Sequence, residues 1–122
     1  NDFSGNELTG VPGQQFFGST YIDLFGAYAE VNLTWIDEIP ITDANDVYAP
    51  AYHLLDISGG YSIQIQNWNV DFRGWVRNVL NTDYASMVQV NASAFGSNEP
   101  RYYYPGMPRN FMARIKLSYY IN

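Results

Sequence analysis

The sequence predicts an all-β fold built from antiparallel strands in which apolar and polar residues alternate. Three observations support this prediction. Apolar residues rarely keep the three- and four-residue spacing of an amphipathic helix, whereas alternation at every second residue is frequent along the 122 residues. β-Branched and aromatic residues dominate the alternating segments, as is typical of strands. Turn-forming residues separate these segments.

Five strands are expected. In chain order they cover residues 15–24, 27–36, 53–66, 70–79 and 110–121, and the fourth could run on to residue 90. The dipeptide "FG" at 25–26 and the tripeptide "NWN" at 67–69 are short enough to form tight hairpins. The connections at 37–52 and 91–109 are long and together contain several prolines and glycines, so they are expected to be loops.

Short turns at one end of the strands and long loops at the other are typical of an outer-membrane β-barrel. The strand length agrees with this reading. Ten residues at about 3.3 Å each, tilted by about 40°, reach a height of about 25 Å, which is that of the apolar band of such a barrel. The alternative is a soluble antiparallel β module that binds a ligand or partner, with the apolar faces as its core, because alternation alone fits both.

The polar faces of the expected strands carry the charged residues. In the last strand, Arg114 and Lys116 alternate with apolar residues such as Ile115. An Arg or Lys at the bilayer midplane costs about 2 to 4 kcal/mol, so these side chains are expected to face the lumen. The same reasoning places four acids and four bases on the inner wall: Asp23, Glu30, Asp56, Asp71, Arg73, Arg77, Arg114 and Lys116. Such a balance suggests ion pairing with something that fills the lumen.

No catalytic residue, metal, cofactor or nucleic-acid partner is expected. The net charge is −6 with only six Lys and Arg residues, whereas phosphate binding needs clustered cations. His53 is the only histidine and there is no cysteine, so neither a zinc site nor a catalytic triad is expected. The segment 43–48 lacks the glycine and glutamate of a calcium loop. Gly59-Gly60 lies within a strand and indicates either close approach of the backbone to another group or a bend.

Five segments in order resemble the C-terminal end of TonB-dependent outer-membrane receptors. They are "GNELTGVPGQQF" (5–16), "AYAEVNLTWI" (27–36), "YHLLDISGGY" (52–61), "VDFRGWVRNVLNTDYASMV" (70–88) and "PGMPRNFMARIKLSYYIN" (105–122). The residues that match the family's patterns are Leu54, Leu55, Asp56, Gly60, Tyr61, Asn78, Val79, Leu80, Asn81, Tyr84, Pro105, Gly106, Pro108 and Arg109. Asn81 stands where the family usually has Asp. The resemblance covers nearly the whole chain.

The resemblance implies a barrel of 22 strands with a plug domain inside, of which residues 1–122 are the C-terminal part; the plug and about 17 earlier strands would lie outside this chain. It implies the outer membrane of a Gram-negative bacterium and active uptake of a scarce nutrient, most readily a ferric siderophore. The expected partners are the rest of the same receptor, outer-membrane lipid, the small-molecule substrate and, through the part outside this chain, the TonB complex.

The resemblance also implies roles for two groups of residues. The family gathers substrate in its long loops, and the last long loop here carries an aromatic and basic group: Phe95, Arg101, Tyr102, Tyr103 and Tyr104. These five are expected to contact substrate. The eight charged residues of the inner wall are expected to contact the plug.

Overall fold

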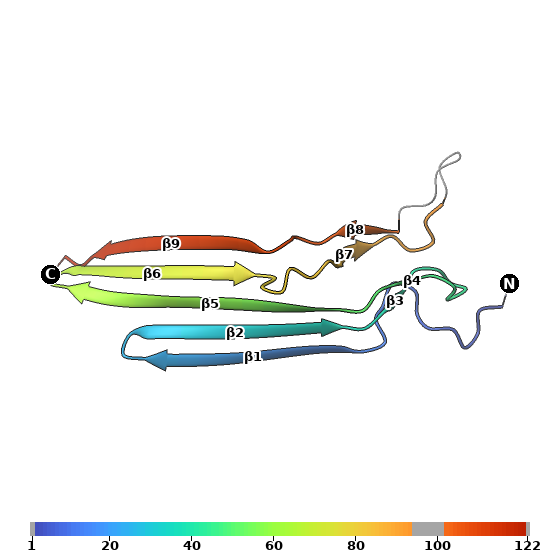
Figure 1. Ribbon diagram of the computed structural model, residues 1–122, viewed down its shortest axis with the longest axis horizontal. Helices are drawn as coiled ribbons and strands as arrows, with labels where there is room; N and C mark the ends of the chain where they lie inside the picture. The colour runs from blue at the N-terminus through green and yellow to red at the C-terminus, as the bar shows by residue number, and fades with distance from the viewer. Residues whose placement is uncertain (1, 94–101, 122) are drawn as a thin grey trace.

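The computed structural model describes residues 2–93 and 102–121, and its main element is one antiparallel sheet of five long strands (Figure 1). The strands are β1 (Gln15–Leu24), β2 (Ala27–Ile36), β5 (Tyr52–Ile65), β6 (Trp68–Arg77) and β9 (Asn110–Tyr119). They lie in the order β1-β2-β5-β6-β9, which confirms the predicted antiparallel all-β segment. The sheet is open, with β1 and β9 at its edges. Within residues 2–93 and 102–121, no helix is long and apolar enough to cross a bilayer.

Both predicted hairpins form, one of them at a shifted position. Phe25 and Gly26 join β1 to β2 with φ angles of 54° and 82°, the left-handed conformation that a two-residue type I′ turn requires at both positions. The second turn is Gln66-Asn67, so the prediction of a turn at 67–69 was wrong. Gln66 takes a φ of 54° and closes the turn early. Trp68 is therefore free to pair with Ile65 and to pack 4.9 Å from the ring of Tyr119.

The two long connections contain short hairpins that the alternation did not predict. β3 (Ile39–Pro40) pairs with β4 (Tyr48–Ala49), and β7 (Ala85–Val88) pairs with β8 (Tyr103–Pro105). All four lie at the same end of the sheet, opposite the tight turns (Figure 1). We call the described residues of 37–51 and 78–109 the loop rim.

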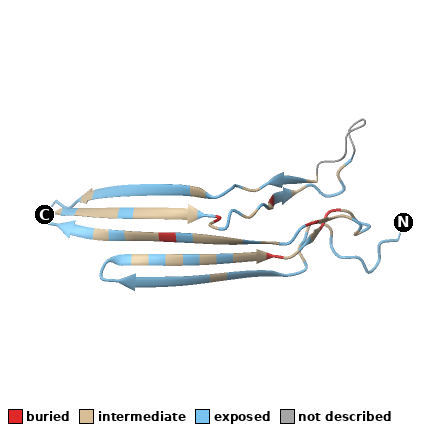
Figure 2. Cartoon of the chain, viewed as in Figure 1, coloured by how far each residue is buried: buried red, intermediate tan, exposed pale blue. Residues whose placement is uncertain are grey.

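The loop rim holds the small hydrophobic core of the described residues. Ile41, Ala49 and Ala85 are buried there, and most other residues are half-buried or exposed (Figure 2). The partly buried residues packed against this core come from both connections: Ile39, Val47, Val88 and Tyr102. The two connections therefore support each other at one end of the sheet.

The segment before β1 is attached to the loop rim. The backbone N–H of Gly10 donates to the Pro40 carbonyl at 2.8 Å, and the Glu7 N–H donates to Asn45 Oδ1 at 2.6 Å. Gly10 has a φ of +80°, and a Cβ there would lie 2.9 Å from Val90 Cγ1. Glycine is therefore needed both for the backbone conformation and for the close approach.

One face of the sheet is apolar and uncovered. By register, Val31, Ile57, Val76 and Phe111 form one row across four strands. Phe111 is 72% exposed and Ile115 is 65% exposed, and no described element covers this face (Figure 2). A contiguous apolar surface of this kind is unsuited to water and suited to lipid.

Ile115→Arg is expected to destabilise the protein in a bilayer by about 2 to 4 kcal/mol, because the guanidinium would lie in hydrocarbon near the middle of β9. Urea unfolding in lipid vesicles measures the change. Met112→Arg is the matched control, since Met112 lies on the opposite face of the same strand and is also exposed. Equal losses for the two variants would contradict a lipid-facing assignment of Ile115.

Candidate functional site

The polar face of the sheet carries all eight predicted inner-wall charges. Directly paired residues point to the same side of a sheet, and side chains alternate along each strand. Three consecutive rows follow from the register, from the loop rim toward the turns. The first consists of the pairs Asn32-Asp56 and Arg77-Asn110, the second is Glu30-Ser58-Trp75-Met112, and the third is Tyr28-Gly60-Arg73-Arg114. Asp23 pairs with Tyr28, and Asp71 pairs with Lys116 in the next row.

The acidic residues of this face are engaged by neighbours within the sheet. Asp23 Oδ2 accepts a hydrogen bond from the Tyr21 hydroxyl at 3.2 Å. Glu30 Oε1 accepts one from Asn32 Nδ2 at 3.0 Å. Asp56 Oδ1 accepts one from the backbone N–H of Asn78 at 2.8 Å, where the chain leaves β6. Asp71 lies directly opposite Lys116, and opposite charges at such positions stabilise the strand pair.

Two arginines lie together on this face among aromatic rings. Arg73 pairs directly with Arg114. The Cζ atom of Arg73 lies 5.0 Å from the centre of the Tyr28 ring and 5.9 Å from that of Trp75, and Arg114 Cζ lies 5.8 Å from Trp75. These are cation–π distances. We call Tyr28, Arg73, Trp75 and Arg114 the arginine–aromatic cluster.

Gly60 makes this cluster possible. A Cβ at Gly60 would lie 2.5 Å from Tyr28 Cε1 and 2.5 Å from the Phe72 carbonyl. The absence of a side chain lets the Tyr28 ring lie across Gly60 toward Arg73, which is the next residue in the same row. The close approach expected at Gly59-Gly60 is thereby confirmed, although the sequence did not indicate that Tyr28 and Trp75 would take part.

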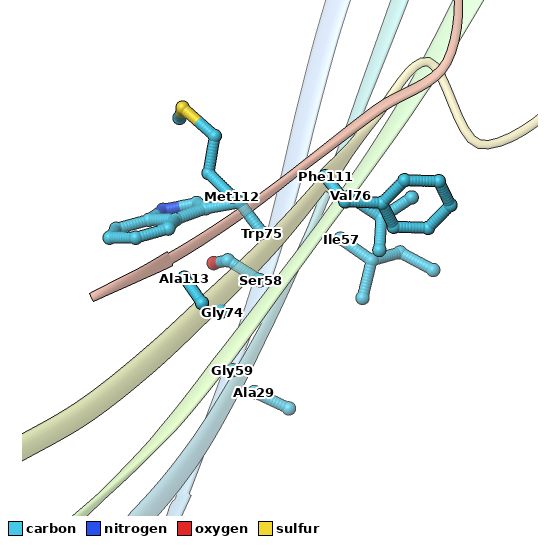
Figure 3. Close-up of a pocket in the computed structure, with 10 residues that line it drawn as sticks. All are labelled: Ala29, Ile57, Ser58, Gly59, Gly74, Trp75, Val76, Phe111, Met112 and Ala113. Atoms are coloured by element: carbon cyan, nitrogen blue, oxygen red, sulfur yellow. The ribbon is translucent and has the colours of Figure 1, made fainter. Parts of the chain in front are cut away.

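A shallow groove of about 600 Å³ crosses the sheet where small residues face one another (Figure 3). Ala29, Gly59, Gly74 and Ala113 are paired in turn across four strands. In Figure 3, Ile57, Val76 and Phe111 project to one side of the strands and Trp75 and Met112 to the other, so the lining comes from both faces of the sheet. No charged residue lines the groove, so it offers van der Waals contact and no group for acid–base chemistry.

The residues predicted to contact substrate have different surroundings. Phe95 and Arg101 lie outside the described residues. Tyr102 is half-buried against the core of the loop rim, and its carbonyl accepts a hydrogen bond from Gln89 N–H at 2.6 Å. Tyr103 and Tyr104 are 53% and 59% exposed. Tyr103 also lines a hollow of about 260 Å³ on the rim with Pro50, Asp83 and Tyr84 among others.

Asp43, an acidic residue of the loop rim, has structural partners. The Thr9 hydroxyl donates to Asp43 Oδ1 at 2.6 Å and lowers the pKa of the Asp43 carboxyl group below its ordinary value, and a side-chain hydrogen bond with Asn91 acts in the same direction. The backbone N–H of Asp43 also donates to Asn91 Oδ1 at 3.1 Å. His53 is the second residue of β5 and pairs with Trp35. Within residues 2–93 and 102–121, no three His, Cys, Asp or Glu side chains come together in a way that could hold a metal ion.

Several residues that match the family patterns connect β6 to β9. Asn78 is 4% exposed and bonds through its side chain to residues 82 and 107. Asn81 Oδ1 accepts a hydrogen bond from the backbone N–H of Arg109 at 3.0 Å. Gly106 N–H donates to the Tyr84 carbonyl at 2.7 Å. These residues therefore fix the end of the sheet, and they do not line a chemical site.

A protein-family model described as "TonB dependent receptor-like, beta-barrel" matches residues 1–79. The matched part contains β1, β2, β5 and β6, four of the five long strands. Proteins of this family are transporters and not enzymes. The chain therefore belongs to the β-barrel of the TonB-dependent receptor family, and it forms part of a larger transporter barrel in the outer membrane of a Gram-negative bacterium.

Proposed function

We propose that the receptor takes up a ferric siderophore by TonB-dependent active transport, with residues 1–122 as the C-terminal part of its barrel. The observation that supports this most directly is the sheet with two unlike faces. One face is apolar and uncovered, and the other carries eight charged residues. A wall of this kind meets lipid on the outside and a polar filling on the inside.

In this proposal the polar filling is a plug domain held by the inner-wall charges. The charged residues lie in successive rows along the strands, so they would contact a plug over much of its height. The TonB complex would act through a part of the receptor outside this chain. The chain itself would provide the wall and the loop rim.

The loop rim would help to capture the substrate. Tyr103 and Tyr104 present exposed rings at the end of the sheet that carries the long connections. Aromatic rings with hydroxyl groups can stack on a planar ligand and donate hydrogen bonds to oxygen-rich chelating groups. The acidic rim disfavours a strongly anionic cargo, so a neutral or cationic ferric complex fits best.

The alternative of a soluble β module fits the molecule less well. Such a module needs a core beneath the apolar faces of its strands. Among the described residues, the buried apolar side chains of the main sheet are few, and Phe111, Ile115 and Leu117 are each more than 60% exposed. Exposed rows of this kind in five adjacent strands favour a lipid-facing wall.

A transport assay with the intact receptor tests the proposal. In an iron-limited Gram-negative strain that lacks other siderophore receptors, the receptor should support TonB-dependent uptake of radioactive iron with at least one member of a siderophore panel. The double variant Tyr103→Ala/Tyr104→Ala should lower the affinity by at least about fivefold through loss of ring contacts. Tyr120→Ala is the matched control, because this exposed tyrosine lies beside the β5–β6 turn. Folded receptor that takes up no ferric siderophore would refute the proposal.

A further inference from the structure

The arginine–aromatic cluster contains two cations that face each other without a carboxylate between them. Arg73 and Arg114 are directly paired across β6 and β9. Like charges at directly opposite positions destabilise a strand pair. The cation–π contacts with Tyr28 and Trp75 offset part of this repulsion but satisfy no N–H group.

Two buried polar atoms of this cluster lack a hydrogen-bond partner. They are Arg73 Nε and the Tyr28 hydroxyl oxygen. Buried donors in native proteins are almost always paired. Two donors without an acceptor, in a cluster that holds two guanidinium groups, therefore indicate that an acceptor is supplied from elsewhere.

The acidic residues nearest along the polar face do not supply that acceptor. Asp23, which pairs with Tyr28 in the cluster's own row, accepts a hydrogen bond from the Tyr21 hydroxyl. Glu30, in the adjacent row, is hydrogen-bonded to Asn32. Asp71, two residues before Arg73, lies opposite Lys116. Among the described residues, none of these three carboxylates hydrogen-bonds to a guanidinium of the cluster. The eight charges are balanced in number, but their arrangement leaves a local excess of positive charge at Arg73 and Arg114.

The position of the cluster along the strands indicates which partner would reach it. Arg73 is the sixth of ten residues of β6, and Arg114 is the fifth of ten residues of β9. At about 3.3 Å per residue, the cluster lies about 15 Å from either end of these strands. A ligand held on the loop rim would be far from this depth, whereas a domain that fills the lumen would lie against it.

We propose that the arginine–aromatic cluster is the docking point for one carboxylate side chain, Asp or Glu, of the plug domain. A carboxylate has two oxygens and can accept hydrogen bonds from both guanidinium groups at once. It would accept a hydrogen bond from Arg73 Nε–H, lie beside the Tyr28 hydroxyl and offset the repulsion between the two arginines. This inference rests on the proposed function, because it needs a plug inside the barrel.

The test measures how firmly the plug is held in the intact receptor, without substrate. The urea concentration at which the plug becomes accessible to protease reports this directly. Arg73→Gln and Arg114→Gln should each lower that midpoint by about 1 M. The double variant should lower it no further than the larger single effect, because one carboxylate bridges both groups. Arg109→Gln, an exposed residue just before β9, is the matched control and should leave the midpoint unchanged.

Two further variants keep the result interpretable. Arg73→Lys keeps the charge but loses the forked donor geometry, so its midpoint should fall between those of the wild type and Arg73→Gln. Arg73→Glu should release the plug, and second-site changes that restore the wild-type midpoint should replace a single acidic residue of the plug with Lys or Arg. Suppressors that map elsewhere would overturn the proposal.

The remaining outcomes are also decisive. If the Arg→Gln variants leave the midpoint unchanged and weaken siderophore binding, the pair serves the substrate and the proposal is wrong. If they change neither, the pair is solvated and the proposal is wrong. Because the midpoint is measured without substrate, failure of siderophore uptake would refute the proposed cargo and leave this inference standing.

Discussion

Gly106→Ala is expected to prevent most of the receptor from reaching its folded state, although alanine adds a single methyl group. A Cβ at this position would lie 2.1 Å from Tyr84 Cζ, 2.2 Å from Cε1 and 2.4 Å from Cε2. These distances are far below van der Waals contact, so the ring or the backbone would have to move.

Neither group can move freely. The Gly106 N–H donates to the Tyr84 carbonyl at 2.7 Å, which holds the two backbones together. The Tyr84 ring also packs against Tyr52, with ring centres 5.0 Å apart. Gly106 does not have a positive φ, so the backbone itself would accept alanine and the effect comes from the ring contact. Overpacking of this severity costs about 3 kcal/mol or more.

The folded fraction of outer-membrane receptor, measured by heat-modifiable migration on a gel, checks this expectation. Gly74→Ala is the matched control, because a Cβ there would have its nearest neighbour at 3.9 Å, and it should fold normally. Tyr84→Ala added to Gly106→Ala should restore part of the folded fraction, whereas Tyr84→Phe should not, since it keeps the ring. If Gly106→Ala folds as well as Gly74→Ala, the close approach is not a constraint on folding.

Asn78→Ala is expected to lower the free energy of unfolding by about 3 to 4 kcal/mol. The Asn78 side chain donates to the carbonyls of Thr82 and Met107 at 2.8 and 3.1 Å, and its Oδ1 accepts from Thr82 N–H at 2.8 Å. Each such bond contributes about 1 kcal/mol, and the buried partners would be left unsatisfied. Asn78 also has a φ of 51°, a conformation that asparagine tolerates better than alanine.

Two control variants separate these causes in a urea titration of the receptor in vesicles. Asn78→Gly also removes the side chain, but glycine adopts a positive φ without strain. It should therefore lose less free energy of unfolding than Asn78→Ala, and the difference is the contribution of the backbone conformation. Asn81→Ala shares the positive φ, at 54°, but its exposed side chain accepts only one hydrogen bond, from Arg109 N–H. Asn81→Ala should therefore lower the free energy of unfolding by less than half as much as Asn78→Ala does. Equal losses at the two positions would show that the backbone conformation alone matters.

The main sheet could be predicted because its signals are local. Alternation and the Phe25-Gly26 turn predicted β1 and β2 with the bounds observed. β5 begins and ends one residue before the predicted bounds, and β6 begins two residues before its predicted start. The reason is that Gln66 takes the left-handed conformation, which its residue type did not indicate. β3, β4, β7 and β8 were missed because strands of two to four residues show no alternation. They form through contacts between connections distant in sequence, such as Ile41 with Ala85.

The polar face could be predicted in part. Alternation was enough to group the eight charges on one side, but their partners depend on the register of strands that are far apart in sequence. The direct pairing of Arg73 with Arg114 joins residues about forty positions apart and leaves no local signature. Alternation likewise puts Tyr28 on the polar face but gives it no role, because only the register places Gly60 beside it.

The order of the long strands has a consequence for the rate at which this part of the barrel forms. Each strand pairs with the next long strand in the chain, two of the connections are two-residue turns, and the other two are shortened by their own hairpins. Loop-closure entropy is therefore small at every step, and pairing can proceed as successive hairpins on a fast timescale. The slow steps in building this wall are expected at β1 and β9, whose outer edges must find strands that are not their neighbours within this sheet.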